Sequence, residues 1–195
     1  MYRHENTARE EPAPMVDQLV TPRLMLSPLG TADTEALHAL WTAPGVRRFL
    51  WDDEVIPTDR TAEVVRRSAL LFAERGLGLW SARLRDSVSG YGGAKLAGFA
   101  GYWYFRDPPE LELLYGVAEP LWGRGLGTEL ARVMIQYAWG SLGFHDVNAS
   151  TDRGNTASVR VLEKLGFTMT RHAVVGGLDT VFFTLARPPM ETAAE

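Results

Sequence analysis

The chain of 195 residues contains no cysteine. This absence excludes a disulfide framework, a thiolate metal site and a cysteine nucleophile. Histidine is scarce as well, with four residues of which no two have the i, i+4 spacing of a helical metal motif. No apolar run is long enough to span a bilayer, and residues 1–18 have no apolar core of the secretory kind. We therefore expect a cytoplasmic protein that binds no metal and no membrane.

An excess of basic residues is also missing. The chain has 20 lysines and arginines against 24 aspartates and glutamates, a net charge of −4, so nucleic acid is not an expected partner. Hydrophobic residues make up 46% and charged residues 23%, which is typical of a globular protein. The composition predicts a flexible N-terminal tail over residues 1–18, one domain over 19–187 and a C-terminal tail over 188–195.

Strand-like and helix-like patterns alternate along this domain. Strands are predicted over residues 19–29, 79–84, 95–105, 111–118 and 146–151, and as a hairpin over 167–186 that turns at Gly176-Gly177. Helices are predicted from Thr31 or Asp33 to Pro44-Gly45, from Thr58 or Asp59 to Gly76, over 126–139 and over 156–165. This order indicates an α/β (α+β) fold in which helices cover a mixed sheet.

The most informative stretch runs from Leu111 to Tyr137. An apolar, strand-like run breaks at Glu119-Pro120, glycines follow at 123, 125 and 127, and a helical pattern begins. A strand, a glycine turn and a helix start can hold a phosphate on backbone N–H groups. A Walker loop needs a lysine that is lacking here, and a dinucleotide fingerprint needs a different glycine spacing. Two interpretations remain: a site for another phosphate-bearing ligand, or a tight turn alone.

Three segments in sequence order carry a resemblance to a known family. The run from Trp122 to Gly127 resembles the acyl-CoA loop, Gln/Arg-x-x-Gly-x-Gly/Ala, of the GNAT N-acetyltransferase superfamily, with Trp122 in the first position. LVTPRLMLSPL at residues 19–29 resembles the Thr-x-Arg-Leu-x-Leu strand of its RimJ/RimL branch, the ribosomal-protein N-terminal acetyltransferase type. NTASVRVLEKLGF at 155–167 resembles the Asn-x-x-Ser helix of that branch, which ends in Glu-Lys-x-Gly-Phe.

The resemblance implies the GNAT fold, with a mostly antiparallel sheet of about seven strands. That sheet is splayed between its fourth and fifth strands and flanked by four helices. The implied activity is transfer of an acetyl group from acetyl-CoA to a primary amine, such as a protein N-terminus, by direct attack in a ternary complex. Such a mechanism needs no covalent enzyme intermediate, which suits a chain without cysteine.

The resemblance also implies which residues bind acetyl-CoA. The N–H groups of the loop would hold the pyrophosphate, where the dipole of the following helix favours an anion; these residues are Trp122, Gly123, Arg124, Gly125, Leu126, Gly127 and Thr128. The pantetheine arm would pair with the backbone of Tyr115, Gly116 and Val117 and contact Asn155 and Ser158. Two alternatives stay open: Arg124 as a solvated arginine and Asn155 as a plain helix cap.

Glu112 is the candidate general base, because it occupies the glutamate position of the family's strand. Glu110 lies two residues earlier on the same strand face and is the rival, and a glutamate that simply faces solvent is the third reading. The oxyanion donor would be a backbone N–H near Val117. The family's usual acid, a helix tyrosine, is Leu162 here, so the resemblance shifts that part to Ser158, which otherwise is an ordinary first-turn serine.

The acceptor itself is not readable from the sequence. The variable segments expected to grip it are residues 49–56, which include Trp51, the loop at 85–93 and the turn at 103–109. A small-molecule acetyltransferase acting on an antibiotic, a polyamine or an amino acid is one alternative function. A GNAT-fold sensor that binds acyl-CoA without turnover is another. The oligomeric state, including a homodimer, stays open.

Overall fold

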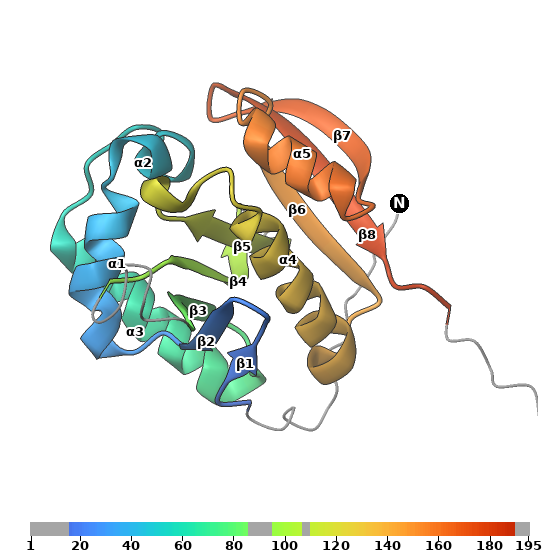
Figure 1. The fold of residues 1–195 in the computed structure, drawn as a ribbon. Helices are drawn as coiled ribbons and strands as arrows, with labels where there is room; N and C mark the ends of the chain where they lie inside the picture. The colour runs from blue at the N-terminus through green and yellow to red at the C-terminus, as the bar shows by residue number, and fades with distance from the viewer. Residues whose placement is uncertain (1–15, 86–94, 107–109, 190–195) are drawn as a thin grey trace, which may run out of the picture.

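The computed structural model describes residues 16–85, 95–106 and 110–189. Two antiparallel sheets lie side by side (Figure 1): one of five strands in the order β1-β2-β3-β4-β5, and one of three in the order β6-β8-β7. The strands are β1 Leu19–Val20, β2 Leu24–Pro28, β3 Leu79–Leu84, β4 Gly98–Phe105, β5 Glu110–Val117, β6 Asp146–Asp152, β7 Thr168–Val175 and β8 Leu178–Ala186. The hairpin predicted to turn at Gly176-Gly177 is confirmed as β7 and β8.

Five α-helices cover the sheets in the described part of the chain, one more than predicted. They are α1 Thr34–Trp41, α2 Pro44–Leu50, α3 Thr58–Arg75, α4 Leu126–Tyr137 and α5 Thr156–Lys164. The additional helix is α2, because Pro44-Gly45 begins a helix instead of only ending one. Proline has the helical φ already fixed and no N–H to satisfy, so the first helical turn accepts it.

The single strand predicted over residues 19–29 is a hairpin of two strands. The chain turns at Thr21, whose backbone N–H donates to the Leu24 carbonyl at 2.9 Å and whose Oγ1 accepts from the Leu24 N–H at 2.9 Å. The prediction of one continuous strand was therefore wrong. The turn places Arg23 beside the glycine loop, which matters for the site.

The two sheets meet where β5 lies beside β6. β4 pairs with β5 from Gly98 opposite Val117 to Phe105 opposite Glu110, whereas no backbone ladder joins β5 to β6 among the described residues. These two strands are the fourth and fifth of those predicted, at 111–118 and 146–151, so the expected splay is confirmed. The edge of β5 that faces β6 is left without a strand partner.

Helices on both faces fix the orientation of β5. On one face α4 packs, with the Tyr102 hydroxyl donating to the Met134 carbonyl at 3.0 Å. On the other face lie α1 and α3 (Figure 1), where Trp41 of α1 contacts Phe99 edge to face at 5.5 Å. Side chains alternate along a strand, so β5 turns Tyr115 and Val117 toward α4 and Glu110 and Glu112 toward the opposite face.

Candidate active site and cofactor loop

The glycine loop reaches α4 through left-handed backbone. Gly123 and Gly125 have φ values of 73° and 76°, a region that residues with a Cβ enter at a cost. Gly125 is the residue that precedes the helix, and no side chain caps the first turn of α4. The first N–H groups of a helix have no partner within the helix, so this end is suited to an anion. The geometry therefore suits the predicted phosphate site, which stays a prediction.

The β1–β2 hairpin holds this loop against α4. The Arg23 guanidinium donates from Nη1 to the Arg124 carbonyl at 2.6 Å and from Nε to the Glu129 carboxylate at 2.7 Å. The Thr21 hydroxyl donates to the same carboxylate at 2.5 Å. Partial burial opposes the charge on Glu129, but these hydrogen bonds and the Arg23 charge outweigh it and hold the pKa of Glu129 below its ordinary value.

The sequence did not reveal this contact, although Thr21 and Arg23 belong to the motif that resembles the RimJ/RimL strand. The motif by itself predicts only a strand. Its partner Glu129 lies 106 residues from Arg23 in the chain, and no local pattern signals a pairing over that distance. The structure thus gives this motif a position next to the cofactor loop.

The segments predicted to bind the pantetheine arm, the end of β5 and the start of α5, lie next to each other. The Tyr115 hydroxyl donates to the Ser158 carbonyl at 3.4 Å, and burial raises the pKa of Tyr115 to about 12. A Cβ on Gly127 would stand 3.7 Å from the Tyr115 ring and 3.9 Å from Val117. The structure therefore brings the strand, loop and helix parts of the predicted site together.

Trp122 also contacts the end of β5. Its side chain is half exposed, and its indole N–H donates to the Val117 carbonyl at 2.7 Å. One of the backbone groups expected to pair with pantetheine is thus already bonded to the loop. The Val117 N–H, expected as the oxyanion donor, is a separate group, and its role stays a prediction.

The start of α5 is capped as expected, because Asn155 Oδ1 accepts from the Ser158 N–H at 3.3 Å. Leu162, which stands where the family has a tyrosine, is only 1% exposed and belongs to the hydrophobic core. An apolar side chain there stabilises the packing of α5 and offers no proton. The part assigned to Ser158 stays a prediction.

Glu112 is buried and fully engaged. The residue is 3% exposed, its Oε2 accepts from the Ser150 hydroxyl at 2.6 Å, and its Oε1 forms an ion pair with Arg106. Arg106 also pairs with Glu110 at 2.8 Å. Both candidate bases therefore share one guanidinium. Sequence reasoning missed Arg106 and Ser150, since neither belongs to a motif.

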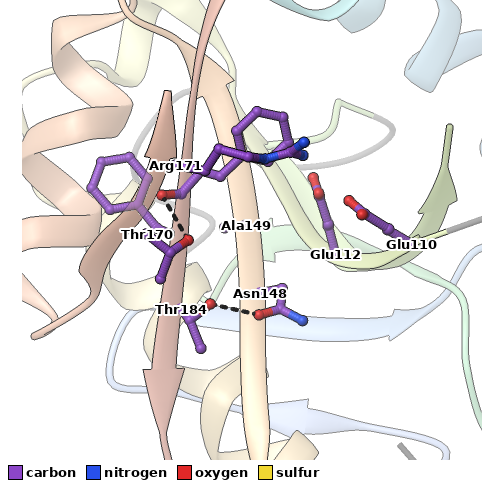
Figure 2. A pocket seen from close by; sticks show the side chains of 9 residues that line it. Glu110, Glu112, Asn148, Ala149, Thr170, Arg171 and Thr184 are labelled. Carbon is purple, nitrogen blue, oxygen red and sulfur yellow. Dashed lines mark hydrogen bonds between the residues drawn. The ribbon is translucent and has the colours of Figure 1, made fainter. Parts of the chain in front are cut away.

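Glu110 and Glu112 line a cavity of about 200 Å³ on the face of β5 that turns away from α4 (Figure 2). The remaining lining comes from the three-stranded sheet: Asn148 and Ala149 from β6, Thr170 and Arg171 from β7, and Phe182, Phe183 and Thr184 from β8. The cavity thus lies between the two sheets, beside the candidate base. An acceptor amine is expected to bind at this position.

Of the three segments expected to grip the acceptor, only one is described completely. Asp52 and Asp53 follow α2 with φ values of 53° and 65°. Burial, and next the nearby charge of Asp52, raise the pKa of Asp152 at the end of β6. The segment 49–56 thus reaches the splayed strands, while Trp51 packs on Trp41 at 5.4 Å. Most of the 85–93 loop and residues 107–109 lie outside the described residues.

Comparison with known proteins identifies the family. The model of the GNAT acetyltransferase domain matches residues 23–168. The chain belongs to the GNAT acetyltransferase family. The uncharacterized N-acetyltransferase YoaA of Bacillus subtilis is 25% identical over 150 residues, which cover 76% of this chain and 81% of that protein. Mycothiol acetyltransferase of Corynebacterium efficiens is 30% identical over 149 residues, 75% of this chain and 45% of that protein.

Solved GNAT structures share the fold. A putative GNAT acetyltransferase from Bordetella pertussis superposes with a TM-score of 0.73 at 21% identity, covering 88% of this chain and all of that one. The structure of RimL, the ribosomal L7/L12 alpha-N-protein acetyltransferase, in complex with coenzyme A superposes with a TM-score of 0.68 at 18% sequence identity. The superposition covers 86% of this chain and 96% of that one. YncA from Salmonella typhimurium, a putative acetyltransferase with acetyl-CoA bound, superposes with a TM-score of 0.65 at 23% sequence identity. The superposition covers 84% of this chain and 93% of that one.

As a GNAT N-acetyltransferase the protein uses acetyl-CoA as its acyl donor. The residues present fit that group, because the uncapped start of α4 lies behind two left-handed glycines and beside the edge of β5 that pairs with no other described strand. Within the described ranges, no three histidine, aspartate or glutamate side chains gather to hold a metal ion. The helices of that same part include none with the length and apolarity of a membrane span.

Proposed function

We propose that the protein acetylates a primary amine, a protein N-terminus or a similar group, by direct attack on acetyl-CoA in a ternary complex. The observation that carries this proposal is the uncapped, glycine-bounded start of α4 next to the edge of β5 that pairs with no strand in the described part of the chain. Binding both substrates side by side removes much of the entropic cost of a two-body encounter. The RimJ/RimL-like branch is the assignment that the motifs at residues 19–29 and 155–167 favour.

In this proposal the loop from Trp122 to Thr128 holds the pyrophosphate, and the backbone of Tyr115 to Val117 together with Asn155 and Ser158 holds the pantetheine arm. Acetyl-CoA supplies the activated acyl group and a thiolate leaving group. A backbone N–H near Val117 stabilises the negative oxygen that forms during attack.

Glu112 then removes the proton from the attacking amine, directly or through the Ser150 hydroxyl, which already donates to it at 2.6 Å. A hydroxyl in this position accepts a proton from the amine while it passes its own to the carboxylate. Arg106 holds the carboxylate in place by an ion pair. Glu110 stays the rival base, since the same guanidinium binds it.

A small-molecule acceptor is the second candidate. The cavity beside Glu112 has a volume of about 200 Å³, below the roughly 300 to 1,000 Å³ of drug-sized ligand sites. It accommodates a small amine or the end of a chain. One relative, mycothiol acetyltransferase, is named for a small-molecule reaction. A non-catalytic acyl-CoA sensor is the third candidate, which Leu162 in place of a tyrosine keeps open.

Thiol release on mixing the protein, acetyl-CoA and an amine panel tests the proposal. The panel contains short peptides with free N-termini and small amines. Amine-dependent thiol release supports an enzyme, and the better group of acceptors separates the two enzymatic candidates. Acetyl-CoA binding with no thiol release for any amine would favour the sensor. We also keep the cytoplasm as the proposed location.

A further inference from the structure

The cavity beside Glu112 has two walls of different chemistry (Figure 2). The β5 wall presents the carboxylates of Glu110 and Glu112. The opposite wall, from the three-stranded sheet, presents Arg171, Asn148 and two threonines. Hydrogen-bond acceptors therefore face donors across the same small space.

Arg171 brings a cation to this wall of the cavity. Its guanidinium carbon lies 3.8 Å from the centre of the Phe182 ring, and it pairs with no carboxylate in the part of the chain that is described. A guanidinium stacked on a ring keeps its N–H groups free at the edge, where they bind carboxylates in two-pronged fashion. In Figure 2 the guanidinium end of Arg171 points toward the side of the cavity where Glu112 lies.

Asn148 adds a second donor on the same wall. Its Oδ1 accepts from the Thr184 hydroxyl at 2.8 Å, which orients the amide so that the NH₂ group is left for a ligand. The Thr170 hydroxyl donates to the Phe182 carbonyl at 3.3 Å and fixes the neighbouring backbone. The wall thus offers N–H donors at two places.

The β5 wall keeps a negative charge. Glu110 and Glu112 both pair with Arg106, and one guanidinium neutralises only one of two carboxylates. Among the described groups of the cavity, one negative charge on the β5 wall therefore faces the unpaired Arg171. A ligand that carries both an ammonium and a carboxylate matches this arrangement, because each of its charges meets the opposite sign.

We propose that this cavity binds the acceptor as a zwitterion, with its amine at Glu110 and Glu112 and its carboxylate at Arg171 and Asn148. The proposal rests on the acetyl transfer proposed above and favours its second candidate, a small-molecule acceptor, over a protein N-terminus. The substrate class is amino acids and related amines that carry a carboxylate. Arg171 is the residue that determines specificity. The rival is a polyamine, whose second cation would be drawn instead to the neighbouring carboxylates of Asp52 and Asp152.

Acceptor pairs that differ in the presence of the anionic group test this proposal. Alanine against alaninamide and 4-aminobutyrate against its amide vary the carboxylate, and phosphoethanolamine against ethanolamine tests a phosphate. A diamine represents the polyamine class. The expected result is a kcat/KM about tenfold higher for each carboxylate than for its amide, as one charged hydrogen-bonded contact supplies. The variant Arg171→Gln loses this preference while its KM for acetyl-CoA is unchanged.

Arg153→Gln is the matched control, since Arg153 is an exposed arginine that pairs with Asp179 and does not line the cavity; it keeps the preference. Equal rates for acids and amides, a preference for the diamine or the phosphate, or a preference that survives in Arg171→Gln overturns the proposal. If no amine is acetylated, the proposed acetyl transfer is wrong. Calorimetry with the same acceptor pairs then tests whether the cavity binds the carboxylate. Tighter binding of the acids that is lost in Arg171→Gln supports the site, and equal binding overturns it.

Discussion

Glu112 combines two properties that usually exclude each other. It is buried within an apolar strand, yet it has two partners, Ser150 and Arg106, that make a carboxylate tolerable there. A base that is held in one orientation next to a hydroxyl is suited to take a proton from a neighbouring amine. Its burial is therefore consistent with catalysis as well as with a structural role, and only a substitution separates the two.

Glu112→Gln keeps the shape of the side chain and removes the charge. We expect kcat to fall by about 10²- to 10⁴-fold, the range for loss of a positioned base, while KM for acetyl-CoA stays the same. Steady-state thiol release measures both quantities. Because Gln still accepts from Ser150, the melting temperature shows how much of the effect is structural.

The paired variant Glu110→Gln removes the charge two residues away on the same face. If Glu112 is the base, Glu110→Gln keeps a kcat close to that of the unchanged protein and raises only the KM of the acceptor, since Glu110 contacts the amine in the cavity. A large loss in Glu110→Gln together with full activity in Glu112→Gln would transfer the role to Glu110.

At the scale of secondary-structure elements, the β1–β2 hairpin is a support for the cofactor loop. Arg23 bonds the Arg124 carbonyl and, through Glu129, the first turns of α4. Since a helix start binds an anion only when its N–H groups are aimed at it, we expect Arg23→Ala to raise the Kd of acetyl-CoA about tenfold. Titration calorimetry measures this constant.

Arg60→Ala serves as the control, because Arg60 forms an exposed ion pair with Glu63 on α3 and has no contact with the loop. Its acetyl-CoA affinity should equal that of the unchanged protein. An Arg23→Ala variant with unchanged affinity would show that the hairpin stabilises the fold without supporting the loop.

The same contact predicts a pH dependence of stability. The folded pKa of Glu129 lies below its ordinary value of 4.5, so its contribution is complete above that value and is lost as the pH falls through the folded pKa. Glu129→Gln should be less stable than the unchanged protein at neutral pH and should lose less stability on acidification. Urea unfolding at several pH values between neutral and acid gives the free energy of unfolding of both proteins. If the two free energies change in parallel with pH, the role given to Glu129 is wrong.

At the scale of the whole molecule, the sequence predicted those parts of the fold that have local signals. The end of α3 at Gly76 and the β7–β8 turn at Gly176-Gly177 depend on glycine in left-handed backbone, and these predictions are confirmed. The helix α2 was missed because Pro44-Gly45 suits the start of a helix as well as its end. Local chemistry alone does not distinguish these two cases.

The candidate site also has one part with a local signal in the sequence and one part without. The cofactor loop is a continuous run of residues, so its spacing is visible in the chain. The surroundings of Glu112 come from separate parts of the chain. Ser150 lies on β6, 38 residues from Glu112, and Arg106 follows β4, 44 residues from Ser150. Such contacts arise only when the two sheets meet. The cavity wall with Arg171 belongs to the same class and has no signal in the sequence.

Stabilisation by acetyl-CoA is the measurement that tests the central claim most directly. A ligand that binds only the folded state raises its stability, by about 2.7 kcal/mol at a hundredfold excess over Kd, so millimolar acetyl-CoA should raise the melting temperature. Gly125→Asp should abolish the shift by placing a carboxylate at the pyrophosphate. In the control Gly125→Asn, the asparagine has the shape of the aspartate without its charge and also tolerates left-handed backbone. This variant should retain part of the shift in melting temperature. A melting temperature of the unchanged protein that millimolar acetyl-CoA leaves unmoved would contradict the account.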